Sequence, residues 1–374
     1  MNRLFIDIHV LQTVPPSNLN RDDTGSPKSA FYGGVRRARV SSQAWKRATR
    51  AEFGQRLDKA DLGVRTKRSV ELIADILEAD HGMERDAAVA RASAALEAMG
   101  LKPKVGKAPR GSTEPPVAQT DYLIFFSRRQ LERIAAVAAV GEKPTKKDVT
   151  EAMDREHGIE VGLFGRMVAD NKELSVDASV QVAHAISTHA VEDESDYFTA
   201  VDDVTQDEGE ETGAGMLGTV EFNSATLYRY ATLNVEGLQA NLGDPEATAR
   251  AAAVFVGDFV RSMPTGKQNT FANRTTPDGV VVMLREDQPV NLVGAFEQAV
   301  RANGAGGRVE ESAKRLAAQA QAVRAFVDEP AHTFVVTAGA AAEPLAALGA
   351  TMRITELCDR VEAAVSAYLG ADRP

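Results

Sequence analysis

Residues 17–50 concentrate the side chains that could bind an anion. This stretch contains eight Lys or Arg residues and two Asp residues, a net charge of +6, although the whole chain carries −10. Such a local reversal is typical of a phosphate-binding surface, because local fields attract ligands more strongly than net charge does. The plainer alternative is a solvated basic surface without a ligand. The cations are Arg21, Lys28, Arg36, Arg37, Arg39, Lys46, Arg47 and Arg50.

The second half of this stretch has the spacing of a basic helix face. Ser41 or Ser42 can cap a helix that we expect to run to about Leu57. Trp45 falls on the opposite side and can pack inward. The macrodipole disfavours cations at a helix start, so their presence there favours a bound phosphate. The face, at positions i, i+3, i+4 and i+7, consists of Gln43, Lys46, Arg47 and Arg50.

Two other groups of residues could support metal-dependent chemistry. Asp22 and Asp23 lie in a loop beside the cations, where a carboxylate could bind a metal ion and direct cleavage of an RNA backbone. The alternative, which we favour, is that they orient Arg21 and the turn. His184 and His189 are five residues apart, and this odd spacing puts them on opposite faces of a strand. We therefore predict no metal site, no cofactor and no catalytic residue.

Composition places the chain among ordinary globular proteins. It has 374 residues, of which 44% are hydrophobic and 26% charged, enough for a sizeable core in one or two domains. Cys358 is the single cysteine, so no intrachain disulfide can form, which fits a reducing compartment. No apolar run approaches membrane-spanning length, and the first residues alternate like a strand rather than a signal peptide. We expect a cytoplasmic protein with no membrane partner.

The elements that must position the basic residues follow a mixed α+β pattern. Alternating apolar residues predict a strand at 3–13, and a long Pro- and Gly-rich loop follows at 15–34. Further strands are expected at 180–191, 218–234, 280–284 and 332–338. Further helices are expected at 65–100, 121–140, 144–157, 244–262, 290–303, 308–326 and 353–369.

Four segments carry a resemblance to a known family. They are SNLNRDDTG with GGVRRARVSSQAWKRATR in 17–50, HAISTHAVEDESDYFTAVDD (184–203), LGTVEFNSATLYRYATLN (217–234) and PTGKQNTFAN (264–273). Together they resemble the CasC family, the crRNA-binding backbone subunit of the type I-E CRISPR surveillance complex, Cascade. The resemblance covers roughly the first 300 residues, and the remaining tail matches weakly.

The resemblance implies a particular α+β fold. It consists of a modified RRM-like (ferredoxin-like) palm at 1–60 and 175–374, a helical "fingers" insertion at 61–174, and a β-hairpin "thumb" at about 192–220. In a standard RRM, aromatic residues such as Tyr228 and Tyr230 would stack on bases. In the modified fold that sheet face is partly covered, so we expect these tyrosines to pack in the core.

The resemblance also implies a non-catalytic function. Several copies would assemble head to tail along one crRNA, and each would bind its backbone without regard to sequence. The spacer would then pair with target DNA in antiviral defence, beside other Cascade subunits and a recruited nuclease–helicase. The implied RNA contacts are Arg21, Lys28, Ser41, Gln43, Lys46, Arg47 and Arg50, supported by Arg166, Met167 and Lys267.

The thumb is implied to act through apolar side chains. The stretch 191–211 contains ten acidic residues and no Lys or Arg, so phosphates would repel it. Phe198 and Val201 are therefore expected to wedge against a base, while the carboxylates face a basic surface of the next copy. The alternatives are a surface loop at this stretch and a buried role for Met167. Two alternatives for the function of the whole protein also remain. One is a metal-dependent endonuclease that uses Asp22 or Asp23, and the other is a general RNA-binding protein.

Overall fold

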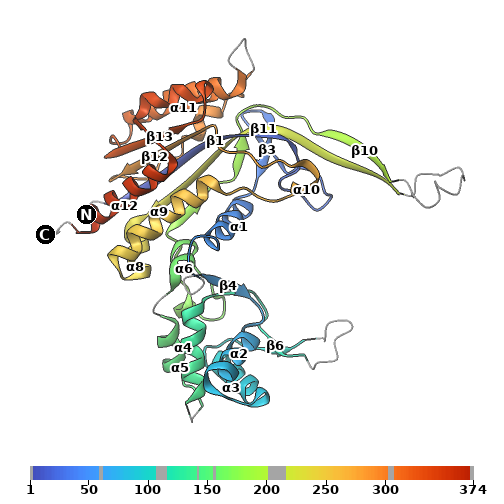
Figure 1. Ribbon diagram of the computed structural model, residues 1–374, viewed down its shortest axis with the longest axis vertical. Coiled ribbons are helices and arrows are strands. Elements are labelled where there is room, and N and C mark those ends of the chain that lie inside the picture. The colour runs from blue at the N-terminus through green and yellow to red at the C-terminus, as the bar shows by residue number, and fades with distance from the viewer. Residues whose placement is uncertain are drawn as a thin grey trace, which may run out of the picture. The chain divides into compact units, whose positions relative to one another are not determined.

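The computed structural model describes residues 3–58, 62–106, 116–140, 143–154, 157–200, 216–301 and 307–370 (Figure 1). The chain divides into two compact units. The first comprises Met1–Glu52, Val182–Thr232 and Ala253–Val361, and the second comprises Phe53–Gln181, Leu233–Ala252 and Glu362–Pro374. The segment predicted as an insertion, 61–174, lies within the second unit, which also draws on two later parts of the chain.

A ten-stranded sheet forms the framework of the first unit. Its order is β14 (Ala350–Thr351), β13 (His332–Thr337), β12 (Gly279–Arg285), β1 (Phe5–Ser17), β11 (Met216–Asn234), β9 (Ala185–Ser187), β3 (Val35–Val40) and β2 (Ser29–Tyr32). Two further strands, β8 (Val180–Val182) and β10 (Glu194–Ala200), also pair with β11. Strand β1 is antiparallel to β12, with Ile8 opposite Val282, and its apolar side chains from Phe5 to Val14 are buried because it runs through the middle of the sheet.

Both faces of this sheet are covered. The helices concerned are α1 (Ser42–Phe53), α9 (Pro245–Arg261), α10 (Gln268–Phe271), α11 (Gly307–Ala322) and α12 (Ile354–Gly370), with 3-10 helices η3 (Leu292–Phe296), η5 (Val323–Ala325) and η6 (Ala340–Leu348). On one face Tyr228 and Tyr230 pack in a core with Leu316 of α11. Between them Arg229 projects to the opposite face and stacks on Trp45 of α1. The expected packing of the two tyrosines is therefore confirmed.

The second unit is mainly helical. It contains α2 (Ser69–His81), α3 (Arg85–Ala98), α4 (Arg128–Ala139), α5 (Lys146–Met153), α6 (Gly158–Phe164), η2 (Lys172–Leu174) and α8 (Val235–Leu242). Its two ribbons pair β4 (Gly63–Thr66) with β7 (Ile124–Ser127) and β5 (Lys104–Val105) with β6 (Ala118–Gln119). Ile73, Leu77 and Ile134 lie in its apolar core. Among the described residues, none of the helices has the length and hydrophobicity needed to cross a membrane.

Several local expectations differ from the structure. The helix expected to reach about Leu57 ends at Phe53, and the one expected at 121–140 begins with strand β7 and is helical only over α4. The helix expected at 290–303 is wrong, because over the described residues 290–301 only the short η3 forms. The Asn291 side chain accepts a hydrogen bond from the Val293 N–H, and Leu292 N–H donates to the Tyr228 hydroxyl, so side-chain partners replace helical ones. The loop expected at 15–34 contains β2, which turns into β3 through Gly33 and Gly34 at φ +59° and +78°. Such a Gly-Gly turn is a hairpin signal.

A two-stranded ribbon projects beyond the sheet in Figure 1. It consists of β10 and the first part of β11, paired antiparallel from Glu194 opposite Phe222 to Ala200 opposite Met216. The family resemblance implied a hairpin at about 192–220, and both arms of the ribbon are strands. Residues 201–215, which connect the arms, lie outside the described residues.

Candidate nucleic-acid interface

Helix α1 presents its basic face outward because its other side is fixed to the core. The Ser41 Oγ accepts the Ala44 N–H at 3.2 Å, so of the two predicted cap residues, Ser41 and Ser42, it is Ser41 that caps the helix. Trp45 is fully buried against the Arg229 guanidinium, 3.7 Å from its carbon to the ring centroid. On the outer side Gln43 and Arg47 are exposed and Lys46 and Arg50 are half-buried.

Arg229 is the buried counterpart of these surface cations. Its guanidinium donates to the Gln12 side-chain oxygen at 2.6 Å and to the Phe259 carbonyl. Burial lowers the pKa of Arg229 to about 9. The Thr49 hydroxyl adds a second tether, 3.1 Å from the Ser262 hydroxyl. The inner side of α1 is thus held by polar contacts as well as by apolar packing.

Residues 18–28 form a loop with a defined turn. The Asp22 carboxylate accepts hydrogen bonds from the Thr24 hydroxyl at 2.7 Å, the Thr24 N–H at 2.9 Å and the Ser26 N–H at 3.0 Å. These bonds, the hydroxyl first, lower the pKa of Asp22. Arg21 is exposed, Lys28 is half-buried, and the loop is closed by a β-bridge between Arg21 and Pro27. Asp22 therefore orders the turn that carries Arg21.

A second loop, residues 264–273, packs against the first. Gly266 lies so close to the Leu19 carbonyl that an added Cβ would stand 2.1 Å from its oxygen. The next residue, Lys267, adopts a left-handed backbone at φ +51° and begins the single turn of α10. Phe271 contacts Phe222 at the root of the ribbon, with ring centroids 5.8 Å apart. The structure thus brings Lys267 to the side of the 18–28 loop.

Both faces of the ribbon carry polar and aromatic side chains, because alternation places Phe198 on the face of Glu194 and Asp196 and places Tyr197 on the other. Phe198 is 41% exposed, and its ring lies over Gly218, its partner in the register. Tyr197 on the other face is 61% exposed and was missed by the sequence argument, although strand alternation could have identified it. Val201, the second expected wedge residue, lies outside the described residues.

Arg166 and Met167 are neighbours with opposite environments. Arg166 is 4% exposed, and its guanidinium donates to the Leu174 carbonyl at 2.7 Å and the Gln130 side-chain oxygen at 3.0 Å. Burial lowers the pKa of Arg166 to about 10. A phosphate could reach its side chain only at the expense of these bonds, so we leave Arg166 out of the interface. Met167 is 83% exposed and is not the buried methionine of the alternative.

Arg37, within the basic stretch 17–50, is buried in the same way as Arg166. It is fully buried, and its guanidinium donates to the carbonyls of Phe296 at 2.8 Å and Ser187 at 3.1 Å. Gly33 approaches the Glu297 carbonyl so closely that a Cβ there would collide with it. These contacts dock the β2–β3 hairpin, so Arg37 contributes to the fold rather than to a phosphate surface.

The two histidines of the 184–189 segment have separate partners. His189 accepts the Thr226 N–H at 3.0 Å and lies 2.9 Å from the Ala190 carbonyl, and burial lowers its pKa to about 4. His184 accepts the Ser42 N–H at 3.3 Å, at the start of α1. Burial, followed by the nearby Arg39 and Lys28 charges, lowers the pKa of His184. Within the described residues, no three His, Cys, Asp or Glu side chains are grouped to hold a metal ion.

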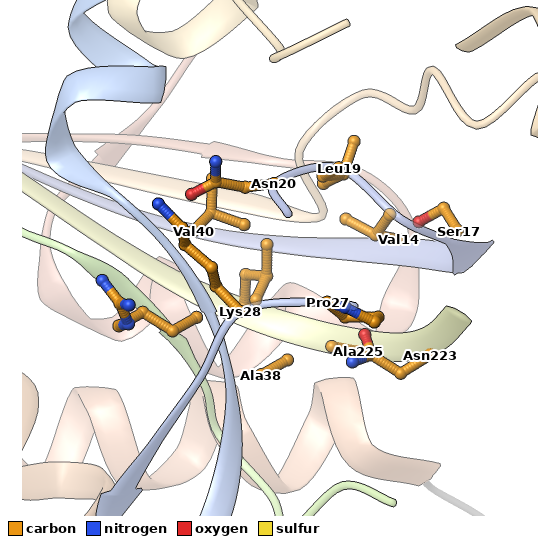
Figure 2. Close-up of a pocket in the computed structure, with 12 residues that line it drawn as sticks. Val14, Ser17, Leu19, Asn20, Pro27, Lys28, Ala38, Val40, Asn223 and Ala225 are labelled. Atoms are coloured by element: carbon orange, nitrogen blue, oxygen red, sulfur yellow. The ribbon is translucent and has the colours of Figure 1, made fainter. Parts of the chain in front are cut away.

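A small hollow lies beneath the 18–28 loop (Figure 2). Its volume is about 20 Å³, which is roughly what one buried water requires and far too little for a nucleotide base. The hollow therefore belongs to the packing of the loop on β1, β3 and β11. Its labelled polar residues are Ser17, Asn20, Lys28 and Asn223, and its labelled apolar ones include Val14, Leu19 and Ala225.

Comparisons with known proteins extend over nearly the whole chain. The model of a family described as CT1975-like protein matches residues 6–360. A chain of a solved "CRISPR RNA-guided surveillance complex, pre-nicking" is 36% identical with a TM-score of 0.82, covering 96% of this chain and 100% of that one. A chain of a second "CRISPR RNA-guided surveillance complex" is 31% identical with a TM-score of 0.71, covering 96% and 99%. No curated protein matches the chain.

Proposed function

Because the chain belongs to the CT1975-like (CasC) family, we propose that it is the crRNA-binding backbone subunit of a type I-E CRISPR surveillance complex, Cascade. One observation carries the proposed binding site. The exposed face of α1, the 18–28 loop and the 264–273 loop all belong to the first unit, and the two loops pack together through Gly266. Each of the three carries a cation that the family resemblance implies as an RNA contact: Arg47 on α1, Arg21 on the first loop and Lys267 on the second.

The arrangement suits a ligand recognised by its backbone. Gln43 and Arg47 stand exposed on the first two turns of α1, where the positive end of the helix macrodipole also favours an anion. Arg21 and Lys267 extend this surface from the two loops. Contacts of this kind bind phosphates without reading bases, which is what a subunit needs when the spacer sequence varies. We retain Ser41, Lys46, Arg50 and Lys28 in the same interface. Met167, in the second unit, is proposed separately as a supporting RNA contact.

The strand order supports an RRM-like palm. Strands β12, β1, β11 and β9 are adjacent in that order, α1 lies between β1 and β9 in the chain, and α9 lies between β11 and β12. This is the βαββαβ arrangement of a ferredoxin-like fold. The helices of the second unit correspond to the fingers, and the β10–β11 ribbon corresponds to the thumb. The covered face at Tyr228 and Tyr230 explains why this palm would use its loops and α1 instead of its sheet.

Assembly follows from the same proposal. Several copies bind one crRNA head to tail, and Phe198 wedges against a base at regular intervals. The segments between these wedges pair with target DNA. The acidic side chains of the ribbon, including Glu194 and Asp196, face a basic surface of the next copy. Other subunits complete the complex, and degradation of the target falls to a recruited nuclease–helicase.

The bonding of Asp22 argues against the endonuclease alternative. One of its carboxylate oxygens already accepts three hydrogen bonds within its own turn. Incubating the protein with labelled RNA and Mg²⁺ tests this alternative directly. Cleavage that disappears in Asp22→Asn or in Asp23→Asn would replace the binding role with a catalytic one.

Native mass spectrometry of the protein, co-expressed with its genomic neighbours and treated with nuclease, tests the proposed function. We expect several copies on one intact RNA of about 60 nucleotides, because bound subunits protect the backbone that they contact. A monomer or dimer without RNA would contradict the assembly.

A further inference from the structure

Two asparagines tie the 18–28 loop to the rest of the first unit. Asn18 is fully buried, and its side-chain N–H₂ donates to the Gly25 carbonyl and the Glu221 carbonyl, both at 2.9 Å. Gly25 lies in the turn of the same loop, and Glu221 lies at the root of the β10–β11 ribbon. A single amide group thus closes the loop on itself and fastens it to β11.

Asn20 makes the corresponding link to α1. Its side-chain oxygen accepts the Ser41 N–H at 2.9 Å, and its backbone carbonyl accepts the Lys28 N–H at 2.8 Å. Ser41 in turn caps the helix through its Oγ. Figure 2 shows Asn20 and Lys28 beside the same hollow, whose lining residues they share. Asn20 therefore links Lys28 to the start of α1, in addition to the hydrogen bond that the Lys28 carbonyl accepts from the Arg39 N–H at 2.9 Å.

The hydrogen bonding of Asn18 includes an energetic penalty as well as two favourable bonds. Its side-chain oxygen is buried and has no hydrogen-bond partner among the described residues. A buried polar atom without a partner is unfavourable, so an apolar residue would be preferred here if only packing mattered. Asparagine is therefore best explained by its two donated bonds.

We propose that Asn18 and Asn20 are positioning residues for the RNA interface, which hold Arg21 and Lys28 in register with the phosphate-binding start of α1. Neither side chain has to touch RNA for this role. The inference rests on the proposed RNA-binding function, and it adds that the spacing between loop and helix is set by these two side chains.

The test measures binding of the full-length chain to a fluorescein-labelled single-stranded RNA of about 30 nucleotides at several salt concentrations. For Asn20→Ala we expect a loss of about 25-fold in affinity at 0.1 M salt and a decrease of about 1.4 in the salt slope. These values follow from two phosphate contacts at roughly 0.7 each on a single strand. Asn18→Ala is expected to act in the same direction.

A double-mutant cycle separates positioning from general damage. In a background that lacks both cations, Arg21→Ala with Lys28→Ala, adding Asn20→Ala should cost less than twofold, because the contacts that it positions are already gone. If Asn20→Ala lowers affinity equally in both backgrounds, the positioning role is wrong. Asn20 is half-buried, so this variant keeps the test usable if the fully buried Asn18 cannot be replaced.

Asn241 provides a matched control in the second unit. Its side-chain N–H₂ also bridges two carbonyls, those of Gly162 at 2.8 Å and Asp177 at 2.9 Å. Asn241→Ala removes the same kind of bridge and should leave the salt slope unchanged. A wild-type protein without salt-dependent RNA binding would refute the proposed function itself. Wild-type binding that is matched by both asparagine variants would refute only the positioning role.

Discussion

Helix α1 has arginine on both of its sides, and the two sides serve different purposes. Arg47 stands exposed on the outer face, whereas Arg229 lies under the inner face against Trp45. The buried guanidinium donates to side-chain and backbone oxygens, so the protein supplies the partners that water would otherwise provide. The exposed one keeps its donors accessible to a phosphate.

The difference shows that residue type does not determine the role of a cation here. An arginine with carbonyl partners in the core fixes the fold, and its removal should change stability. An arginine on the outer face should change affinity and its dependence on salt. The same division separates Arg37 and Arg166, which are buried, from Arg21 on the 18–28 loop.

The largest effect on stability should come from replacing Arg229, which lies under the inner side of α1. Arg229→Met leaves the Gln12 side-chain oxygen and the Phe259 carbonyl without their donor. We therefore expect the free energy of unfolding to fall by about 3 kcal/mol, since each buried group left without a partner costs about 1–3 kcal/mol. Urea denaturation followed by Trp45 fluorescence measures this. The salt slope of RNA binding by the folded protein should stay at the wild-type value.

Arg47→Met is the matched control on the outer side. An exposed substitution away from caps and networks usually changes stability by no more than about 0.5 kcal/mol. Equal destabilisation by the two variants would remove the distinction between the two sides.

The second effect concerns affinity. Replacing both Lys46 and Arg50 with Gln removes two positive charges from the outer face of α1. We expect affinity for single-stranded RNA to fall about 25-fold at 0.1 M salt, with a decrease of about 1.4 in the salt slope. Fluorescence anisotropy across a salt series measures both values. An unchanged slope would mean that these side chains do not contact phosphates.

The β10–β11 ribbon extends the comparison to an uncharged contact, that of the Phe198 ring with a base. Phe198→Ala should weaken RNA binding by about 1–3 kcal/mol if the ring packs on one base, and it should leave the salt slope unaltered. Tyr197→Ala, on the other face of the same strand, is the control. A change in slope for Phe198→Ala, or an equal loss for both variants, would contradict a specific wedge.

The outer face of α1 could be predicted from the sequence because it depends on local geometry. The spacing of Gln43, Lys46, Arg47 and Arg50 and the cap at Ser41 follow from helical periodicity alone. The burial of Arg37 could not be predicted in the same way, because its acceptors at Phe296 and Glu297 are distant in the chain. The burial of Arg166 could not be predicted for the same reason, since its acceptor Gln130 lies in α4, 36 residues earlier in the chain.

Glycines in the sequence indicated two further features of the fold, but only in part. The Gly33–Gly34 pair indicates a hairpin, yet what fixes its position is the approach of Gly33 to the Glu297 carbonyl. The contact between Gly266 and Leu19 likewise joins two segments that the sequence treated separately. Sequence patterns thus identified the segments that carry candidate contacts, and tertiary packing determined which side chains remain accessible.

Ser41 contributes both to the fold of α1 and to its proposed phosphate interface. Replacing it should change stability less than replacing Arg229 does. Its Oγ caps the helix, and we also place it in the phosphate interface. Ser41→Ala should lower the free energy of unfolding by about 1 kcal/mol, because the Ala44 N–H loses its partner. Ser41→Asp should keep the cap, since aspartate accepts the same hydrogen bond, but its charge would repel a phosphate at the helix start. Denaturation and RNA binding measured on both variants then separate the two roles. If Ser41→Asp binds RNA as tightly as the wild type, no phosphate lies at the start of α1, and the outer face must contact RNA only through its later turns.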